Sequence, residues 1–203
     1  MGESTTGQDT AAVSGLFTAA QACGTVEAFD ASIDGYNDDL ARKSQELVVG
    51  LLRLTPDPFS RTQFTPGHIT CTALVKHPAK PSVLFMHHHR LHRWLLPGGH
   101  VEREDASLHA AAAREALEET HIKLDAAIAP VLAGIDVHGI PAKRSLKGDE
   151  PYHLHHDLIW CFRAVSDEIS ISDEAPSVRW AVPDEWDEMG VAESIRRSIR
   201  RSC

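Results

Sequence analysis

Hydrophobic and polar positions recur at two different spacings along the chain, and the spacing changes near residue 60. Before that point the apolar residues follow helical intervals, which predicts a strong helix over 38–54 and a weaker one over 11–28. The intervals of the stronger helix are set by Leu40, Leu47, Val48, Leu51 and Leu52. Residues 1–10 are small and polar and are expected to be disordered. We therefore expect an N-terminal helical extension over 1–60, acting as a cap or a dimerisation element.

Beyond residue 60 the pattern changes to short apolar and β-branched runs, which predict strands. These runs cover 68–76, 82–88, 93–96, 129–138, 153–164 and 178–182. Helices are expected after a cap at Asp105 or Ser107 and over 191–201, with a helical turn at 183–189. Strands interleaved with helices predict an α/β sandwich. We assign this second domain to residues 61–203.

Composition narrows the classes of protein that fit. The chain has 203 residues, of which 42% are hydrophobic and 24% charged, so a globular fold with a sizeable core is expected. The net charge of −9 argues against a stable nucleic-acid complex. The four cysteines are scattered, with no C-x-x-C zinc motif. Neither a signal peptide nor a membrane-spanning run is visible, so we expect a cytoplasmic protein.

The residues with the most chemical information lie in GGHVEREDASLHAAAAREALEETHI, from Gly98 to Ile122. Residues three and four apart share a helix face, so Glu115 and Glu119 lie one turn apart with Glu118 beside them. Like charges at this spacing destabilise a bare helix. A divalent cation would reverse that cost, because Mg²⁺ and Mn²⁺ prefer carboxylate oxygens and leave positions for substrate phosphates.

The same stretch resembles the box of the Nudix hydrolases, in which a glycine and a glutamate precede the pattern R-E-U-x-E-E-x-G-U, with U aliphatic. Gly99 opens the match, and Arg114 to Ile122 closes it. Two departures are present. The gap between Gly99 and Arg114 is one residue longer than in the pattern, so Glu104 or Asp105 must take the place of the middle glutamate. His121 replaces the late glycine, which puts the usual helix-ending turn in question.

The resemblance implies a Nudix fold, an α/β/α sandwich with a mixed sheet, and a Mg²⁺ or Mn²⁺ cofactor. It implies metal ligation by Glu115, Glu118 and Glu119, of which Glu118 and Glu119 are also candidate catalytic residues. For Arg114 it implies a salt bridge that orients a box glutamate, which we favour over substrate contact. Further candidates for substrate binding are Gly99, Arg90 and His100. Glu102 or Asp105 is expected to supply a supporting hydrogen bond.

Many Nudix enzymes also use an acidic residue from a loop outside the box as a ligand or general base. Glu174 is the best candidate here, since it precedes the strand expected at 178–182. Asp173 and Glu185 are its rivals. The sequence does not decide among them.

Histidines are frequent on both sides of the box. Residues two apart share a strand face, so His87 can pair with His89 and His153 with His155. Such pairs suit metal ligation or phosphate contact, although exposed, hydrogen-bonded histidines are more common. Asp136 and His138 share a strand face in the same way, and Asp157 is placed to fix an imidazole tautomer.

We therefore expect a metal-dependent hydrolase that cleaves a diphosphate bond in a nucleoside diphosphate linked to another group. The stretches RWLLPGGHVE, DVHGIPA and HLHHDLIWCFRA resemble bacterial Nudix proteins of unassigned substrate. Two alternatives stay open: a Nudix-fold nucleotide sensor without catalysis, and an isopentenyl-diphosphate isomerase using Cys71. The substrate and the general base are not determined by the sequence, and a homodimer is compatible with it.

Overall fold

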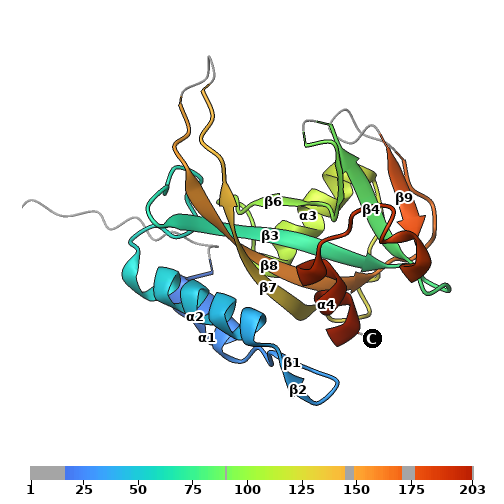
Figure 1. Ribbon diagram of the computed structural model, residues 1–203, viewed down its shortest axis with the longest axis horizontal. Helices are drawn as coiled ribbons and strands as arrows, with labels where there is room; N and C mark the ends of the chain where they lie inside the picture. Colours follow the sequence, from blue (N-terminus) through green and yellow to red (C-terminus); the bar gives the residue numbers. More distant parts are fainter. Residues whose placement is uncertain (1–16, 90, 145–148, 171–176, 203) are drawn as a thin grey trace, which may run out of the picture.

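The computed structural model describes residues 17–89, 91–144, 149–170 and 177–202 (Figure 1). The elements follow the predicted order closely. They are α1 (Ala19–Glu27), β1 (Ser32–Ile33), β2 (Tyr36–Asn37), α2 (Asp39–Leu54), β3 (Gly67–Lys76), β4 (Val83–His88), β5 (Arg93–Leu95), β6 (Gly98–His100), α3 (Leu108–Thr120), β7 (Val131–Ile140), β8 (His153–Arg163), β9 (Val178–Ala181), the 3-10 turn η1 (Pro183–Glu185) and α4 (Glu193–Arg201).

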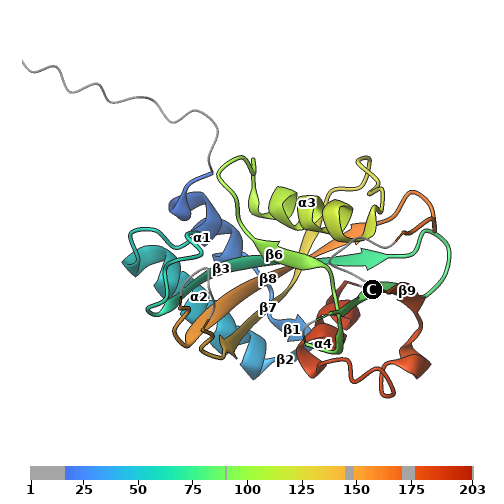
Figure 2. The same ribbon diagram turned by 90° about the horizontal axis from the view of Figure 1, so that it is seen from above.

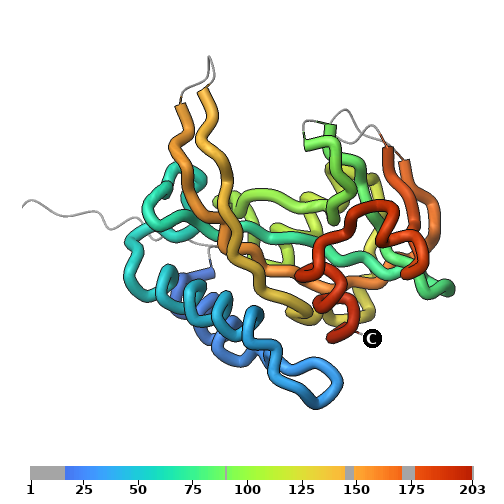
Figure 3. The backbone as a smooth tube through the Cα atoms, in the orientation of Figure 1, coloured from blue at the N-terminus to red at the C-terminus, as the bar shows by residue number. Residues whose placement is uncertain are grey.

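A mixed seven-stranded sheet forms the centre of the molecule. Its main order is β5-β4-β3-β8-β7, with β6 paired to β3 and β9 paired to β4. β3 and β8 run parallel over ten residue pairs, from Gly67↔Leu154 to Lys76↔Arg163, whereas the other strand pairs are antiparallel. The backbone continues the β7–β8 hairpin beyond the strands, where Lys143 pairs with Glu150 (Figure 3). The prediction of a mixed sheet is confirmed.

Alternation along the strands gives the sheet two buried faces. On β3, Ile69, Cys71 and Ala73 belong to a core shared with α1, α2 and α3. Leu74 points the other way, into a second core with Trp186 and with Ile199 of α4. Figure 2 shows α3 and α4 on opposite sides of the sheet. The α/β/α sandwich is therefore confirmed.

The N-terminal helices are tied to the end of the chain by ion pairs. Asp38 caps α2 by accepting hydrogen bonds from the backbone N–H groups of Leu40 and Ala41, both at 3.1 Å. The same carboxylate pairs with Arg197 at 3.0 Å and with Arg201 of α4. The arginines near the end of α4 are therefore engaged within the protein.

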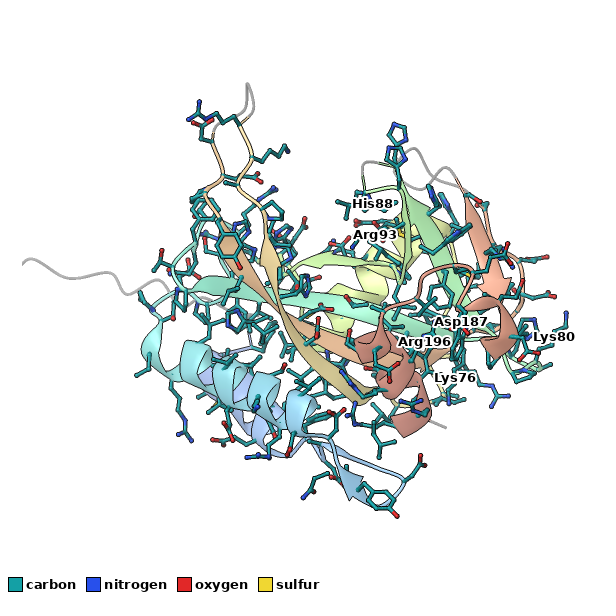
Figure 4. The ribbon with its side chains drawn as sticks, viewed as in Figure 1. Lys76, Lys80, His88, Arg93, Asp187 and Arg196 are labelled. Carbon is teal, nitrogen blue, oxygen red and sulfur yellow. The ribbon has the colours of Figure 1, made fainter. Side chains whose placement is uncertain are left out.

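A second group of polar contacts holds α4 at both of its ends. Arg196 donates to Asp187 at 2.6 Å, and the two side chains lie beside α4 in Figure 4. Lys76, at the end of β3, donates to the carbonyl of Ser202. The helical turn expected at 183–189 is present but shorter, since η1 covers only Pro183–Glu185.

Two local features were not predicted. A two-residue hairpin, β1–β2, lies between α1 and α2, with Asp34 and Gly35 at positive φ in its turn. Residues 98–100 (Gly-Gly-His), expected to lead directly into a loop, form strand β6 instead. Pairing of Gly98 with Thr72 and Gly99 with Cys71 requires close backbone approach, because a Cβ on Gly98 would lie 2.8 Å from the Cys71 carbonyl oxygen.

Among the described residues, no helix has the length and apolar character that crossing a bilayer requires.

Candidate active site

Strand β6 and helix α3 carry the residues of the box. Ser107 caps α3, because its hydroxyl accepts from the Ala110 N–H at 3.1 Å. Ala111, Ala112 and Ala116 are fully buried, so the small face of α3 lies close against the sheet. Glu115 follows Ala112 by three residues and Glu119 follows Ala116 by three, so both glutamates border this buried face and point toward β6. Figure 1 shows α3 beside β6.

Arg114 is the centre of the polar contacts. Its guanidinium makes a bidentate pair with Asp105, at 3.0 and 3.1 Å, and donates to the His100 carbonyl at 2.9 Å. It also donates to Glu115 at 2.9 Å and to Glu118 at 3.3 Å. The hydrogen bonds to Asp105 raise the pKa of Arg114 above its ordinary value. One positive charge thus faces three carboxylates, which leaves a net negative charge that a divalent cation would offset.

The two acids that could take the place of the middle glutamate of the box differ in their contacts. Asp105 is buried, accepts the Arg114 pair and also accepts from the Glu102 N–H at 2.8 Å. Glu104 is exposed. Asp105 therefore supplies the supporting hydrogen bonds to Arg114.

Glu115 and Glu119 both lie against the glycine strand. The carboxylate of Glu119 accepts from the Gly98 N–H at 2.9 Å, and its side chain is buried. A Cβ on Gly99 would lie 2.6 Å from Glu115 Oε1, so this carboxylate rests directly over the backbone. Burial raises the pKa of Glu115 above its ordinary value, while Arg114 opposes that shift. Glu118, with a side chain 57% exposed, is held at the rim by Arg114.

Gly99→Ala is expected to lower kcat by about 10²-fold, because the new methyl group displaces the Glu115 carboxylate by the order of 1 Å. Steady-state hydrolysis assays measure this effect. Gly50→Ala is the matched control, because a Cβ at Gly50 meets nothing within 4 Å and alanine favours the interior of α2. An active Gly99→Ala enzyme would show that the position of Glu115 is unimportant.

His121 ends α3 in the left-handed conformation that a glycine adopts more easily. Its φ is 54° and its N–H donates to the Leu117 carbonyl at 2.9 Å, so the turn forms despite the substitution. A non-glycine residue pays about 1–2 kcal/mol in this conformation.

His121→Gly is accordingly expected to stabilise the protein by about 1 kcal/mol, which corresponds to a Tm higher by about 2–4 °C. Thermal unfolding followed by circular dichroism measures the shift, and activity should stay unchanged. A lower Tm would mean that the His121 side chain contributes more than its backbone costs.

Several predicted site residues cannot be placed. Arg90, Asp173 and Glu174 lie outside the described residues. Glu185 is described, and its carboxylate accepts hydrogen bonds from Arg179 and from the Val182 N–H, so it caps η1. His88 of β4 is paired with Arg93 of β5, and Figure 4 shows their side chains beside each other.

Strands β3 and β8 carry a group of polar residues whose contacts with one another the sequence did not predict. Asp157 is buried and accepts from the hydroxyls of Thr70, at 3.0 Å, and Thr72, at 2.8 Å. Burial raises the pKa of Asp157. Its hydrogen bonds thus go to threonines rather than to an imidazole, and Asp136 is the acid that contacts His138, at 3.0 Å. The parallel pairing of β3 with β8 brings Thr70 opposite Asp157.

His100 faces this same region. Its ring lies 5.0 Å from that of His68, and burial lowers its pKa to about 4. The ring is therefore neutral at neutral pH. Any contact of His100 with a phosphate would be a hydrogen bond without a positive charge.

Comparison with known proteins adds an independent observation. The family model of the NUDIX domain matches residues 68–201, well over half of the chain, including the whole of the β6–α3 site. The chain belongs to the Nudix family. It is a Nudix-type pyrophosphohydrolase by this membership. No curated protein sequence matches it.

Solved structures with a similar fold include other members of the family. A Nudix-family hydrolase from Clostridium perfringens is 15% identical, covering 66% of this chain and 96% of its own, with a TM-score of 0.42. The MutT protein from Methanosarcina mazei Go1 is 22% identical, covering 66% and 90%, with a TM-score of 0.46. A bifunctional NMN adenylyltransferase/ADP-ribose pyrophosphatase from Francisella tularensis is 25% identical, covering 78% and 43%, with a TM-score of 0.39.

Proposed function

We propose that this Nudix protein uses Mg²⁺ or Mn²⁺ to hydrolyse the diphosphate bond of a nucleoside diphosphate linked to another group. One observation carries the proposal. Glu115 and Glu119, one helical turn apart, both rest on the Gly98–Gly99 backbone, while Arg114 holds Glu115 from the side. Carboxylates brought together in this way suit a hard divalent cation.

The proposal assigns a role to each residue of the cluster. Glu115, Glu118 and Glu119 hold the metal, which supplies a Lewis acid for the phosphate oxygens and lowers the pKa of water. Arg114 is a positioning residue, because its contacts lie within the box. The Gly98 N–H orients the Glu119 carboxylate, and Asp105 orients Arg114 in turn.

Proton transfer from the attacking water needs a general base. The candidates that we propose are those predicted from the sequence. Glu118 and Glu119 are the candidates within the box, and Glu174 is the candidate outside it. Substrate contacts are proposed for Gly99, His100 and Arg90. The pH–rate profiles of the variants Glu118→Gln and Glu174→Gln distinguish a metal ligand from the general base.

The two alternative functions are less well supported. An isomerase would need Cys71 as a proton donor, but this thiol is fully buried on β3, and burial raises its pKa well above the ordinary range. A sensor without catalysis has no need for the full carboxylate set, whereas Arg114 here still contacts Asp105, Glu115 and Glu118. Hydrolysis remains the better interpretation.

A substrate panel tests the proposal. Dinucleotide polyphosphates, nucleotide sugars, ADP-ribose and modified nucleoside triphosphates are each incubated with the protein, with Mg²⁺ or with EDTA, and the products are separated by ion exchange. We expect at least one compound to be cleaved at its diphosphate bond only with the metal. Binding of a nucleotide without cleavage of any compound would favour the sensor.

The boundary between the two parts of the chain also stays a proposal. Residues 1–60 are proposed to form a helical extension and 61–203 the hydrolase domain, in keeping with a family match that begins at residue 68. α1 and α2 nevertheless share a core with β3 and β8, so the extension is packed onto the domain.

A further inference from the structure

A group of histidines with no part in the Nudix box lies where β3 and β8 begin. His68 is opposite His155 in the parallel β3–β8 ladder, and His153 lies two residues earlier on β8. Residues opposite each other, or two apart on one strand, share a face of the sheet. The ring centroids are 4.9 Å apart for His68–His155, 5.1 Å for His68–His153 and 5.3 Å for His153–His155. Three imidazoles from two strands thus meet at one point.

Backbone carbonyls fix the tautomers of two of these rings. His68 Nδ1 lies 3.2 Å from the Gln63 carbonyl, and His153 Nδ1 lies 2.8 Å from the Pro151 carbonyl. A carbonyl oxygen only accepts hydrogen bonds, so Nδ1 carries the proton in both rings and Nε2 carries a lone pair. Metal-binding histidines are generally held this way, with the second ring nitrogen donating to a carbonyl or carboxylate.

One of these lone pairs is buried and has no partner. His68 is fully buried, and its Nε2 makes no hydrogen bond within the described part of the chain. A buried acceptor without a hydrogen bond destabilises the folded state, because it has lost its contact with water. A bound cation at this nitrogen would remove that cost.

His68 and His155 present neutral nitrogens rather than positive charge. Burial and the neighbouring histidines lower the pKa of His155 to about 2, and burial lowers the pKa of His68. Metal binding requires the neutral imidazole, whereas attraction of a phosphate would need the protonated ring. With Nδ1 of His68 and of His153 directed at carbonyl oxygens, the Nε2 lone pairs make the cluster better suited to a cation than to an anion.

We propose that His68, His153 and His155 form a binding site for a divalent transition metal of the Zn²⁺ type, separate from the carboxylates of the box. One ligand atom of each residue lies within 4.8 Å of the others. A tetrahedral ion with Zn–N bonds of about 2.0–2.1 Å brings such atoms to roughly 3.4 Å, a closure within the reach of side-chain rotation. An all-imidazole set selects Zn²⁺, Ni²⁺ or Cu²⁺ over Mg²⁺.

The position of the site defines what the ion would do. His68 and His153 are buried while His155 is partly exposed, so three protein ligands leave an open position on the solvent side for water or an external ligand. The ion would link the start of β3 to the start of β8. His100, whose ring lies 5.4 Å from that of His155, connects the site to the box through Gly99.

Metal titration tests the proposal directly. The full chain is freed of metal with a chelator and titrated with Zn²⁺ by isothermal calorimetry, and with Co²⁺ by visible absorption, which reports tetrahedral nitrogen coordination. We expect a single ion per chain bound through this site and a higher Tm with Zn²⁺, because a ligand that binds only the folded state stabilises it. His155→Ala and His68→Asn should each weaken Zn²⁺ binding by at least about 100-fold.

Two controls make the outcome decisive. His138→Ala removes a ring 5.7 Å from His155 but outside the triad, and should leave Zn²⁺ affinity unchanged. The double variant Glu115→Gln/Glu119→Gln should also keep the ion. The proposal is overturned if the wild type binds no Zn²⁺, if His155→Ala binds as tightly as the wild type, or if the ion is lost with the box carboxylates instead. His155 is partly exposed, so the His155→Ala variant is expected to fold. It therefore keeps the test valid if the His68→Asn variant does not fold.

Discussion

Glu119→Gln is expected to lower metal-dependent kcat by about 10³-fold while the protein stays folded. Loss of one anionic ligand removes several kcal/mol of charge stabilisation from the metal-bound transition state, and about 4 kcal/mol corresponds to this factor. The fold should survive because the glutamine amide oxygen can still accept the hydrogen bond from the Gly98 N–H, now 2.9 Å from Glu119. Rates at saturating Mg²⁺, with circular dichroism alongside, measure both effects.

The matched control is Glu46→Gln, the same change at an exposed position of α2 where the carboxylate pairs only weakly with Arg42. It should leave kcat and Tm unaltered. Full activity of Glu119→Gln at saturating Mg²⁺ would remove Glu119 from the metal site. A collapse of its Tm would instead make the residue structural.

Arg114→Ala should be the most destabilising single change in the site. Asp105 is buried, with a side chain 5% exposed, and depends on the bidentate pair with Arg114, whose side chain is 20% exposed. Removing one partner of a buried ion pair costs about 3–5 kcal/mol, because the other charge is left without compensation. At the lower end of this range, Tm should fall by about 6–12 °C. Differential scanning calorimetry measures it.

Two comparisons distinguish the effect of breaking the Arg114–Asp105 ion pair on Tm from the effect of losing a positive charge in general. Arg42→Ala breaks only exposed pairs on α2 and should shift Tm little. Adding Asp105→Asn to Arg114→Ala removes the stranded charge and should recover part of the lost stability, although not the activity. Equal Tm values for Arg114→Ala and the wild type would contradict the role given to this ion pair.

The parts of the fold that could be predicted are those set by local sequence. The spacing of Glu115, Glu118 and Glu119 places them on neighbouring turns of whatever helix they occupy, and Ser107 is a strong N-cap. The strands of the main sheet were predicted from apolar runs, which are also a feature of the local sequence. The structure agrees in these places because local preference and tertiary packing favour the same conformation.

Other features depend on long-range pairing, which the sequence does not reveal. Gly98 and Gly99 have low strand propensity, yet they pair with β3 because only glycine permits the close backbone approach there. His68 meets His153 and His155 only because β3 and β8 run parallel. The sequence suggested His87 and His89 as partners for that pair, whereas the ring of His87 lies against Trp94, 5.3 Å away.

The central claim is that the carboxylates over the glycine strand drive metal-dependent cleavage of a diphosphate bond. The most direct test is ³¹P NMR of the best substrate of the panel, followed in parallel for the wild type and Glu115→Gln, each with Mg²⁺ and with EDTA. The account predicts loss of the diphosphate signals only for the wild type with Mg²⁺. Cleavage at equal rates by Glu115→Gln, or by the wild type in EDTA, would contradict it.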